Sequence, residues 1–225
     1  MGKNELLDGL FDQWKTEYRK KGITIEGFSK DGIVNENSYT KAKCRILFVL
    51  RETNDFPSSN YYQGELRKFL NGTLKYQIWC TVGRWAYWLL NDFPTYQNNV
   101  DANIVHDSLR QTAVLNLKKL TGDSRSDLDE INETSHRDRE FIKREVEIID
   151  PQVVVACGTW SHLVWLLDLE GLPIEEKPPF SYSKNRLYLC TRHPVRADDR
   201  KTYNELKKLW ERAKTYEKRE KKINR

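Results

Sequence analysis

Residues 136–167 read HRDREFIKREVEIIDPQVVVACGTWSHLVWLL, which is the pattern of a helix, a strand and a second helix in direct succession. Pro151 cannot continue the first helix, and the apolar run 151–158 has the length of a buried strand. Gly158 ends that strand, and the run SHLVWLL begins the next helix. Such a succession is typical of an α/β domain.

Three further runs have the short, apolar character of buried strands: 44–50, 113–117 and 186–190. Continuous apolar runs indicate strands that are covered on both faces, as in a parallel sheet. Apolar side chains recur at helical spacing in three other segments and predict helices over 4–20, 76–90 and 199–220. We expect the aromatic stripe of 76–90 to pack in the core. The sequence predicts a three-layer α/β/α domain with a central, mostly parallel sheet, and residues 1–225 show no linker between domains.

Polar side chains follow three of the predicted strands. The segment RETNDF at 51–56 follows the first strand, Asn116 lies near the end of the second, and His193-Pro194 follows the last. In open parallel sheets, ligands bind beyond the carboxyl ends of the strands, near a switch in strand order. We therefore expect these side chains to converge on one ligand.

The formal net charge of +5 is concentrated at residues 211–225, where seven Lys and Arg stand against three Glu. A basic tail attracts phosphates without regard to base sequence. A solvated helix rich in Lys and Glu explains the same composition. Charge alone therefore does not indicate DNA as a partner.

The four cysteines, Cys44, Cys80, Cys157 and Cys190, are far apart and lack the spacing of a zinc site or an iron–sulfur cluster. We expect no metal and no other cofactor. The N-terminal segment mixes charged and apolar side chains, unlike a signal peptide, and no run reaches the roughly 18 apolar residues of a membrane span. We expect a cytoplasmic monomer without a membrane partner.

Four segments together resemble the uracil-DNA glycosylase superfamily, across roughly residues 44–210: ILFVLRETNDF at 46–56, AVLNLKKLTGDSR at 113–125, EVEIIDPQVVVACGTWSHLVWLL at 145–167 and LYLCTRHPVR at 187–196. The first motif aligns without gaps with the mismatch-specific and single-strand-selective branches. Leu50 replaces the motif Gly, and Thr53-Asn54 replaces Pro-Gly, so the loop is shaped differently. The resemblance implies a uracil-DNA glycosylase-like fold that removes a base from flipped-out nucleotides of DNA.

Within this resemblance, Glu52 falls on the residue that activates water, and His193 lies in the His-Pro motif. Cleavage of an N-glycosidic bond needs an anion near the sugar and a donor near the departing base, which these side chains can supply. Asn54 and Asp55 are the nearest substitutes for Glu52. Glu52 as a capping or surface carboxylate, and His193 as a loop residue bonded to backbone, remain alternatives. The other histidines have no matching pattern and are interpreted as structural or surface residues: His106, His136 and His162.

The resemblance also assigns base and DNA contacts. Phe56 matches an aromatic residue that stacks on the extruded base, and Asn116 matches the Asn that reads the pyrimidine. Asn116 as a residue that satisfies a strand-end turn is the alternative. Residues predicted to hold phosphate oxygens on the rim are Lys118, Lys119, Ser124 and Arg125. In the loop after His-Pro, Arg196 is a candidate to fill the stack that the flipped base leaves, with an ordinary helix lead-in as the alternative.

The sequence therefore predicts a monofunctional DNA glycosylase that removes a uracil-like or modified pyrimidine and leaves an abasic site, in DNA repair or in antiviral defence against modified phage DNA. No Lys occupies an obvious motif position for a Schiff base, so strand cleavage is not expected. A non-catalytic, nucleic-acid-binding member of the same fold is the second hypothesis. A hydrolase of free nucleosides or nucleotides is the third.

Overall fold

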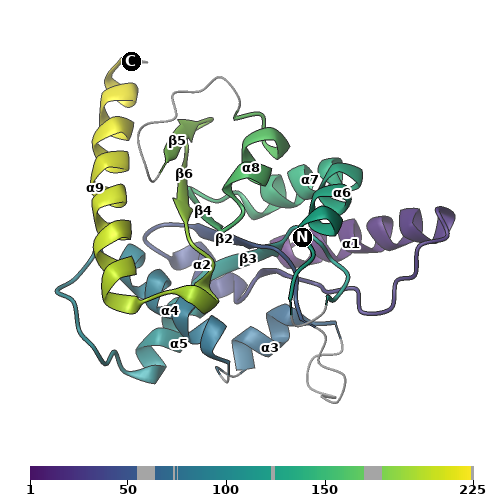
Figure 1. Cartoon of the computed structure of the whole chain (residues 1–225), viewed down its shortest axis with the longest axis horizontal. Coiled ribbons are helices and arrows are strands. Elements are labelled where there is room, and N and C mark those ends of the chain that lie inside the picture. Colours follow the sequence, from purple (N-terminus) through teal and green to yellow (C-terminus); the bar gives the residue numbers. More distant parts are fainter. Residues whose placement is uncertain (55–63, 73, 75, 123–124, 170–178, 224–225) are drawn as a thin grey trace.

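The computed structural model describes residues 1–54, 64–72, 74, 76–122, 125–169 and 179–223 (Figure 1). Within these residues, six strands form a mixed sheet in the order β1-β3-β2-β4-β6-β5. The central strands run parallel and are β2 (Ile46–Leu50), β3 (Thr112–Asn116), β4 (Val153–Cys157) and β6 (Arg186–Thr191). They match the four predicted strands, so the prediction of a mostly parallel sheet is confirmed.

Two short edge strands were not predicted. β1 (Gly32–Ile33) pairs antiparallel with β3, and β5 (Phe180–Ser183) pairs antiparallel with β6. Runs of two and four residues carry too little periodic signal to be recognised in a sequence. They extend the sheet without disturbing its parallel centre.

Helices cover both faces of the sheet, because successive side chains of each strand point to opposite faces. In β2, Phe48 belongs to the core on one face and Val49 to the core on the other. The first face is covered by α3 (Leu66–Gly72), α4 (Gln77–Leu90), α5 (Ala102–Arg110) and α9 (Asp199–Ile223). The second face is covered by α1 (Lys3–Lys20), α2 (Glu36–Lys41), α6 (Leu128–Arg137), α7 (Arg139–Ile149) and α8 (Trp160–Leu166). Figure 1 shows α3, α4 and α5 on one side of the sheet and α6, α7 and α8 on the other.

The aromatic stripe of α4 packs in the core, as predicted. Trp79, Val82, Trp85, Ala86 and Leu89 are all buried against the first face of the sheet. Full burial of a large apolar side chain stabilises a fold by roughly 1.5–3 kcal/mol. Among the helices of the described ranges, none is both long enough and apolar enough to cross a membrane.

The single helix predicted over 136–150 is two helices, α6 and α7, which meet at Asp138. The buried carboxylate of Asp138 accepts hydrogen bonds from the hydroxyl of Tyr18 in α1 and from the guanidinium of Arg137. These partners hold Asp138 at φ −103° and ψ 10°, outside the helical range. The break depends on a tertiary contact with α1, so the local sequence did not reveal it.

The registers align the carboxyl ends of the four parallel strands at one edge of the sheet. Leu50 of β2 pairs with Asn116 of β3, and Cys157 of β4 pairs with Thr191 of β6. Polar residues that are far apart in the sequence are therefore brought to one edge.

Candidate functional site

The carboxyl edge of the sheet carries three residues that the sequence singled out. Asn116 ends β3, Glu52 follows β2 by two residues, and His193 follows β6 by two residues. β3 and β2 are neighbours, whereas β4 separates β2 from β6. With neighbouring strands about 4.8 Å apart, Glu52 and His193 leave strands that are about 10 Å apart. Glu52 and His193 therefore lie at the same edge of the sheet, on either side of the end of β4.

Glu52 is not a surface carboxylate, because only 2% of its side chain is exposed. Lys118 Nζ donates to Oε2 of Glu52 at 3.0 Å, and a carboxylate oxygen of Glu130 lies 2.7 Å from the same ammonium group. The other oxygen of Glu52, Oε1, is buried and has no hydrogen-bond partner among the described residues. A cation thus fixes one oxygen, and the other keeps its capacity to accept a proton or a hydrogen bond.

Gly122 covers the carboxylate of Glu52. Its N–H donates to the carbonyl oxygen of Thr53 at 2.8 Å, and Asn54 forms a parallel bridge with Gly122. A Cβ atom at position 122 would overlap the carboxylate of Glu52. Only glycine therefore allows that carboxylate to lie where it does.

Gly122→Ala is expected to destabilise the protein by about 1–3 kcal/mol, the usual cost of overpacking. In a Glu52→Ala background the cost should be much smaller, because the methyl group then enters the space that the carboxylate left. Urea denaturation of all four members of this double-mutant cycle measures the coupling. Gly9→Ala is the control, since a Cβ atom at that position meets no atom within 4 Å. An equal cost in both backgrounds would contradict the contact.

The amide of Asn116 is fully buried, and neither its oxygen nor its nitrogen has a hydrogen-bond partner in the described part of the chain. The side chain therefore does not satisfy a strand-end turn. Its backbone N–H donates to Oδ2 of Asp31 at 2.6 Å, which fixes the end of β3. A buried polar group without a partner costs about 1–3 kcal/mol. A ligand that pairs with this amide would recover that cost.

Asp31 belongs to a fully buried ion cluster with Lys119 and Glu145. Lys119 Nζ lies 2.6 Å from Oδ1 of Asp31 and 2.7 Å from Oε2 of Glu145, and all three side chains are 0% exposed. Burial alone would lower the pKa of Lys119, but the two carboxylates outweigh it and raise that pKa. Burial, followed by the charge of Asp31, raises the pKa of Glu145 well above its ordinary value. Lys119 therefore does not line the rim where the sequence placed it, because its charge is held in the interior.

Lys118 also departs from the predicted rim, since 4% of its side chain is exposed and both Glu52 and Glu130 hold it. Burial lowers the pKa of Lys118, but hydrogen bonds to Glu130 and Glu52 more than compensate and raise it. Asn54 and Arg125 are exposed, and their assigned roles stay predictions. Several predicted residues lie outside the described part of the structure: Asp55, Phe56, Ser124 and the side chain of Arg196.

His193 precedes a short 3-10 turn, η1 (Pro194–Arg196), and its Nδ1 accepts a hydrogen bond from the N–H of Val195 at 3.4 Å. In a neutral imidazole the proton then sits on Nε2, which becomes the donor. The end of β4 packs against this residue, because the nearest atoms to a Cβ at Gly158 belong to His193. The hydrogen bond to backbone that the alternative interpretation predicted is therefore present. Because that bond uses Nδ1 as the acceptor, Nε2 is the donor.

Sequence reasoning assigned no role to Arg51, Gly122 or Asp31. Arg51 could have been found, because it is the first residue after a buried strand and so begins the carboxyl edge. The role of Gly122 depends on contact with the side chain of Glu52, and that of Asp31 on a partner 88 residues away in the chain. Contacts of that kind cannot be predicted from a local sequence pattern.

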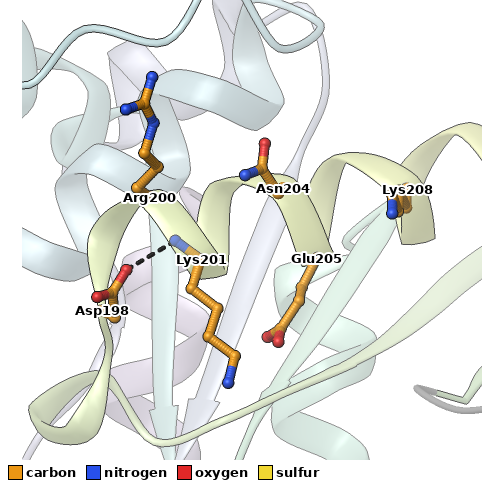
Figure 2. A pocket seen from close by; sticks show the side chains of 6 residues that line it. All are labelled: Asp198, Arg200, Lys201, Asn204, Glu205 and Lys208. Carbon is orange, nitrogen blue, oxygen red and sulfur yellow. Dashed lines mark hydrogen bonds between the residues drawn. The ribbon is translucent and has the colours of Figure 1, made fainter.

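Charged side chains also gather in a depression of about 460 Å³ on the first turns of α9 (Figure 2). Its lining residues are Asp198, Arg200, Lys201, Asn204, Glu205 and Lys208. Arg200 and Asn204 extend to one side of α9, whereas Lys201 and Glu205 extend to the other (Figure 2). Glu205 is already paired with Arg192 at 2.7 Å. These side chains do not converge on one point, so the carboxyl edge of the sheet is the stronger candidate.

No family model matches the chain, and no curated protein matches it either. The resemblance to uracil-DNA glycosylases therefore stays a prediction that rests on the four segments and on the residues described above.

Proposed function

We propose that the protein is a monofunctional DNA glycosylase of the uracil-DNA glycosylase-like fold, which hydrolyses the N-glycosidic bond of a uracil-like or modified pyrimidine. The observation that carries the proposal is a pair of buried groups at the ends of β2 and β3 that have no hydrogen-bond partner among the described residues, the Oε1 atom of Glu52 and the amide of Asn116. One is an anion and the other both donates and accepts hydrogen bonds. They stand at the edge of the sheet where α/β proteins bind ligands.

Each group has a part in the reaction. The bond between C1′ and the base nitrogen breaks and its electron pair leaves with the base, while a water oxygen bonds to C1′. Oε1 of Glu52 accepts the proton of that water, and its negative charge stabilises the cationic sugar. Nε2–H of His193 donates to a carbonyl oxygen of the departing base, and the amide of Asn116 reads the edge of the pyrimidine.

The surroundings of the site support the same assignment. Lys118 holds Oε2 of Glu52, which directs the unpartnered Oε1 to the reaction. Val195, directly after His193-Pro194, is apolar and 66% exposed. An exposed apolar residue beside the site suits insertion into a base stack during flipping. Repair of damaged DNA and defence against modified phage DNA both use this chemistry.

A non-catalytic, nucleic-acid-binding role is the second candidate, and one observation favours it. The Glu52 carboxylate is covered by Gly122 and ion-paired to Lys118, as a structural ion pair would be. Catalysis requires that the cover at Gly122 shift when a nucleotide enters. A purely binding protein has no such requirement.

Release of abasic sites from a panel of DNAs distinguishes the two candidates. The panel holds uracil, hydroxymethyluracil, hypoxanthine, mismatches and glucosylated hydroxymethylcytosine, in single and double strands. A glycosylase yields alkali-labile sites from at least one of them. DNA binding without product from any of them favours the non-catalytic role.

A further inference from the structure

Arg51 is a partly buried arginine without a carboxylate partner in the described ranges of the chain. Its Nη2 donates to the carbonyl oxygen of Gly158 at a long 3.4 Å. Its Nε is buried and has no hydrogen-bond partner among the residues that the structure describes. In the described part of the chain, the positive charge of Arg51 therefore lies beside one weakly bound carbonyl oxygen and no carboxylate.

Several other buried or partly buried arginines in the described ranges have a carboxylate beside them. The pairs are Arg67 with Asp8 at 2.5 Å, Arg84 with Asp199 at 3.0 Å, and Arg45 with Asp150 at 3.0 Å. Such pairing is the general rule, because an uncompensated buried charge is costly. Arg51 departs from the rule at the edge of the sheet where the candidate site lies.

Arg51 and Glu52 are adjacent in sequence but do not neutralise each other. Successive side chains of an extended segment point to opposite sides. Glu52 is engaged by Lys118, which follows β3 on one side of β2, whereas Arg51 reaches Gly158, which follows β4 on the other side. The site thus holds an anionic group, the Glu52 carboxylate, next to a cationic group, the Arg51 guanidinium.

The guanidinium of Arg51 lies near His193 and His162. The nearest atoms to a Cβ at Gly158 belong to His193, so the carbonyl that Arg51 contacts lies beside that residue. Burial, and then the charge of Arg51, lowers the pKa of His162 in α8. A neutral imidazole keeps one N–H donor near the guanidinium.

We propose that Arg51 binds a phosphate group of the substrate, in a subsite between the ends of β2 and β4. A guanidinium presents a planar fork of donors that matches two phosphate oxygens. The assignment of a nucleic acid as ligand rests on the proposed function, whereas the choice of an anion follows from Arg51 itself. The phosphate takes the place at Arg51 and the adjoining sugar faces Glu52, so the subsite sets the register of the nucleotide.

The test is binding of a fluorescent single-stranded oligonucleotide over a series of salt concentrations. Arg51→Gln is expected to weaken binding by about tenfold, the scale of a hydrogen bond to a charged group. It should also reduce the dependence of log K on log salt by about one unit, as loss of one phosphate contact does. Arg51→Lys should keep the salt dependence and lose several-fold in affinity, because lysine lacks the fork. The control is Arg144→Gln, since Arg144 is an exposed arginine on α7 that donates to Gln13.

A second titration, with a deoxynucleoside 5′-monophosphate and with the matching nucleoside, identifies the source of the phosphate. Weaker binding of the monophosphate to Arg51→Gln assigns the subsite to a terminal phosphate. An effect on the oligonucleotide alone assigns it to a phosphodiester. Unchanged affinity and salt dependence for all these ligands overturns the proposal. If Arg51→Gln does not fold, as thermal melting would show, an affinity of Arg51→Lys equal to that of the wild type overturns it.

The outcome is independent of the glycosylase assignment. Suppose that no DNA of the panel releases a base, but Arg51→Gln shows the weaker binding and the lower salt dependence of one lost phosphate contact. The phosphate subsite is then supported and the glycosylase function is rejected. If a base is released while Arg51→Gln binds as the wild type does, the glycosylase function is supported and the phosphate subsite is rejected.

Discussion

Glu52→Gln is expected to slow base release by about 10²-fold to 10⁴-fold, the range of general acid–base contributions. Glutamine keeps the size of the side chain and an oxygen acceptor, but it cannot take a proton from water. It also carries no charge to stabilise the cationic sugar. The fold should survive, because Glu130 stays 2.7 Å from Lys118 and keeps that cation paired.

Single-turnover rates on the best substrate of the panel measure this effect, with DNA affinity and melting temperature recorded for the same variant. Glu133→Gln, on the exposed surface of α6, is the matched control and should behave as the wild type. An unchanged rate for Glu52→Gln would show that Glu52 serves only as a structural ion pair. Loss of affinity together with rate would instead mark Glu52 as a binding residue.

His193→Asn separates the two nitrogen atoms of His193. Asparagine supplies an acceptor for the N–H of Val195, as Nδ1 does, but it has no donor at the position of Nε2. We expect base release to fall by about 10²-fold or more with little change in melting temperature. A rate equal to that of the wild type would exclude His193 as the donor to the departing base.

The second large effect concerns stability. Asp31→Asn is expected to destabilise the protein by about 3–5 kcal/mol, the usual cost of removing one partner of a buried ion pair. Glu145 stays beside Lys119, but burial raises its pKa and so favours its neutral form, which compensates the charge of Lys119 poorly. Lys119 is 0% exposed, so water cannot replace the lost carboxylate. The substitution also weakens the acceptor for the backbone N–H of Asn116. Urea denaturation at neutral pH measures the loss.

Glu145→Gln is the matched control in the same cluster. The pKa of Glu145 is raised well above 4.5 by burial and by the charge of Asp31, so folding favours its neutral form, which glutamine resembles. We expect a cost within about 1 kcal/mol at acidic pH, well below that of a broken ion pair. A cost as large as that of Asp31→Asn would show that Glu145 is the main partner of Lys119.

The pH dependence of stability gives an independent check of Glu145. Its pKa is higher in the folded chain than in the unfolded chain, so the native state binds more protons between the two values. The contribution of Glu145 to the free energy of unfolding of the wild type therefore falls as pH rises above about 4.5. Glutamine does not ionise, so the stability of Glu145→Gln relative to the wild type should increase as pH rises. A relative loss with rising pH would contradict the shift.

The sequence predicted the centre of the fold well because the four parallel strands are continuous apolar runs between helical patterns. It could not predict the break at Asp138, which is held by Tyr18 of another helix. Lys118 and Lys119 show the same limit at the site. They are consecutive residues and both are buried, because carboxylates contributed by distant elements hold each of them in the interior.

The candidate site was predictable to the level of strand ends, because every parallel strand delivers its next residues to one edge. Among the described residues, the Asn116 amide and Arg51 Nε have no hydrogen-bond partner, and this was not predictable because it depends on how distant segments pack around them. Such absences are properties of packing in three dimensions. They are also the features that most favour a ligand here.

The two short edge strands bear on self-association. A long, open edge strand is a template for pairing with another chain and a common route to aggregation. β1 is two residues long and β5 is four, and α9 contacts β5. Copies of this chain at high concentration therefore meet few free backbone groups, at the edges that the structure describes, through which their sheets could join.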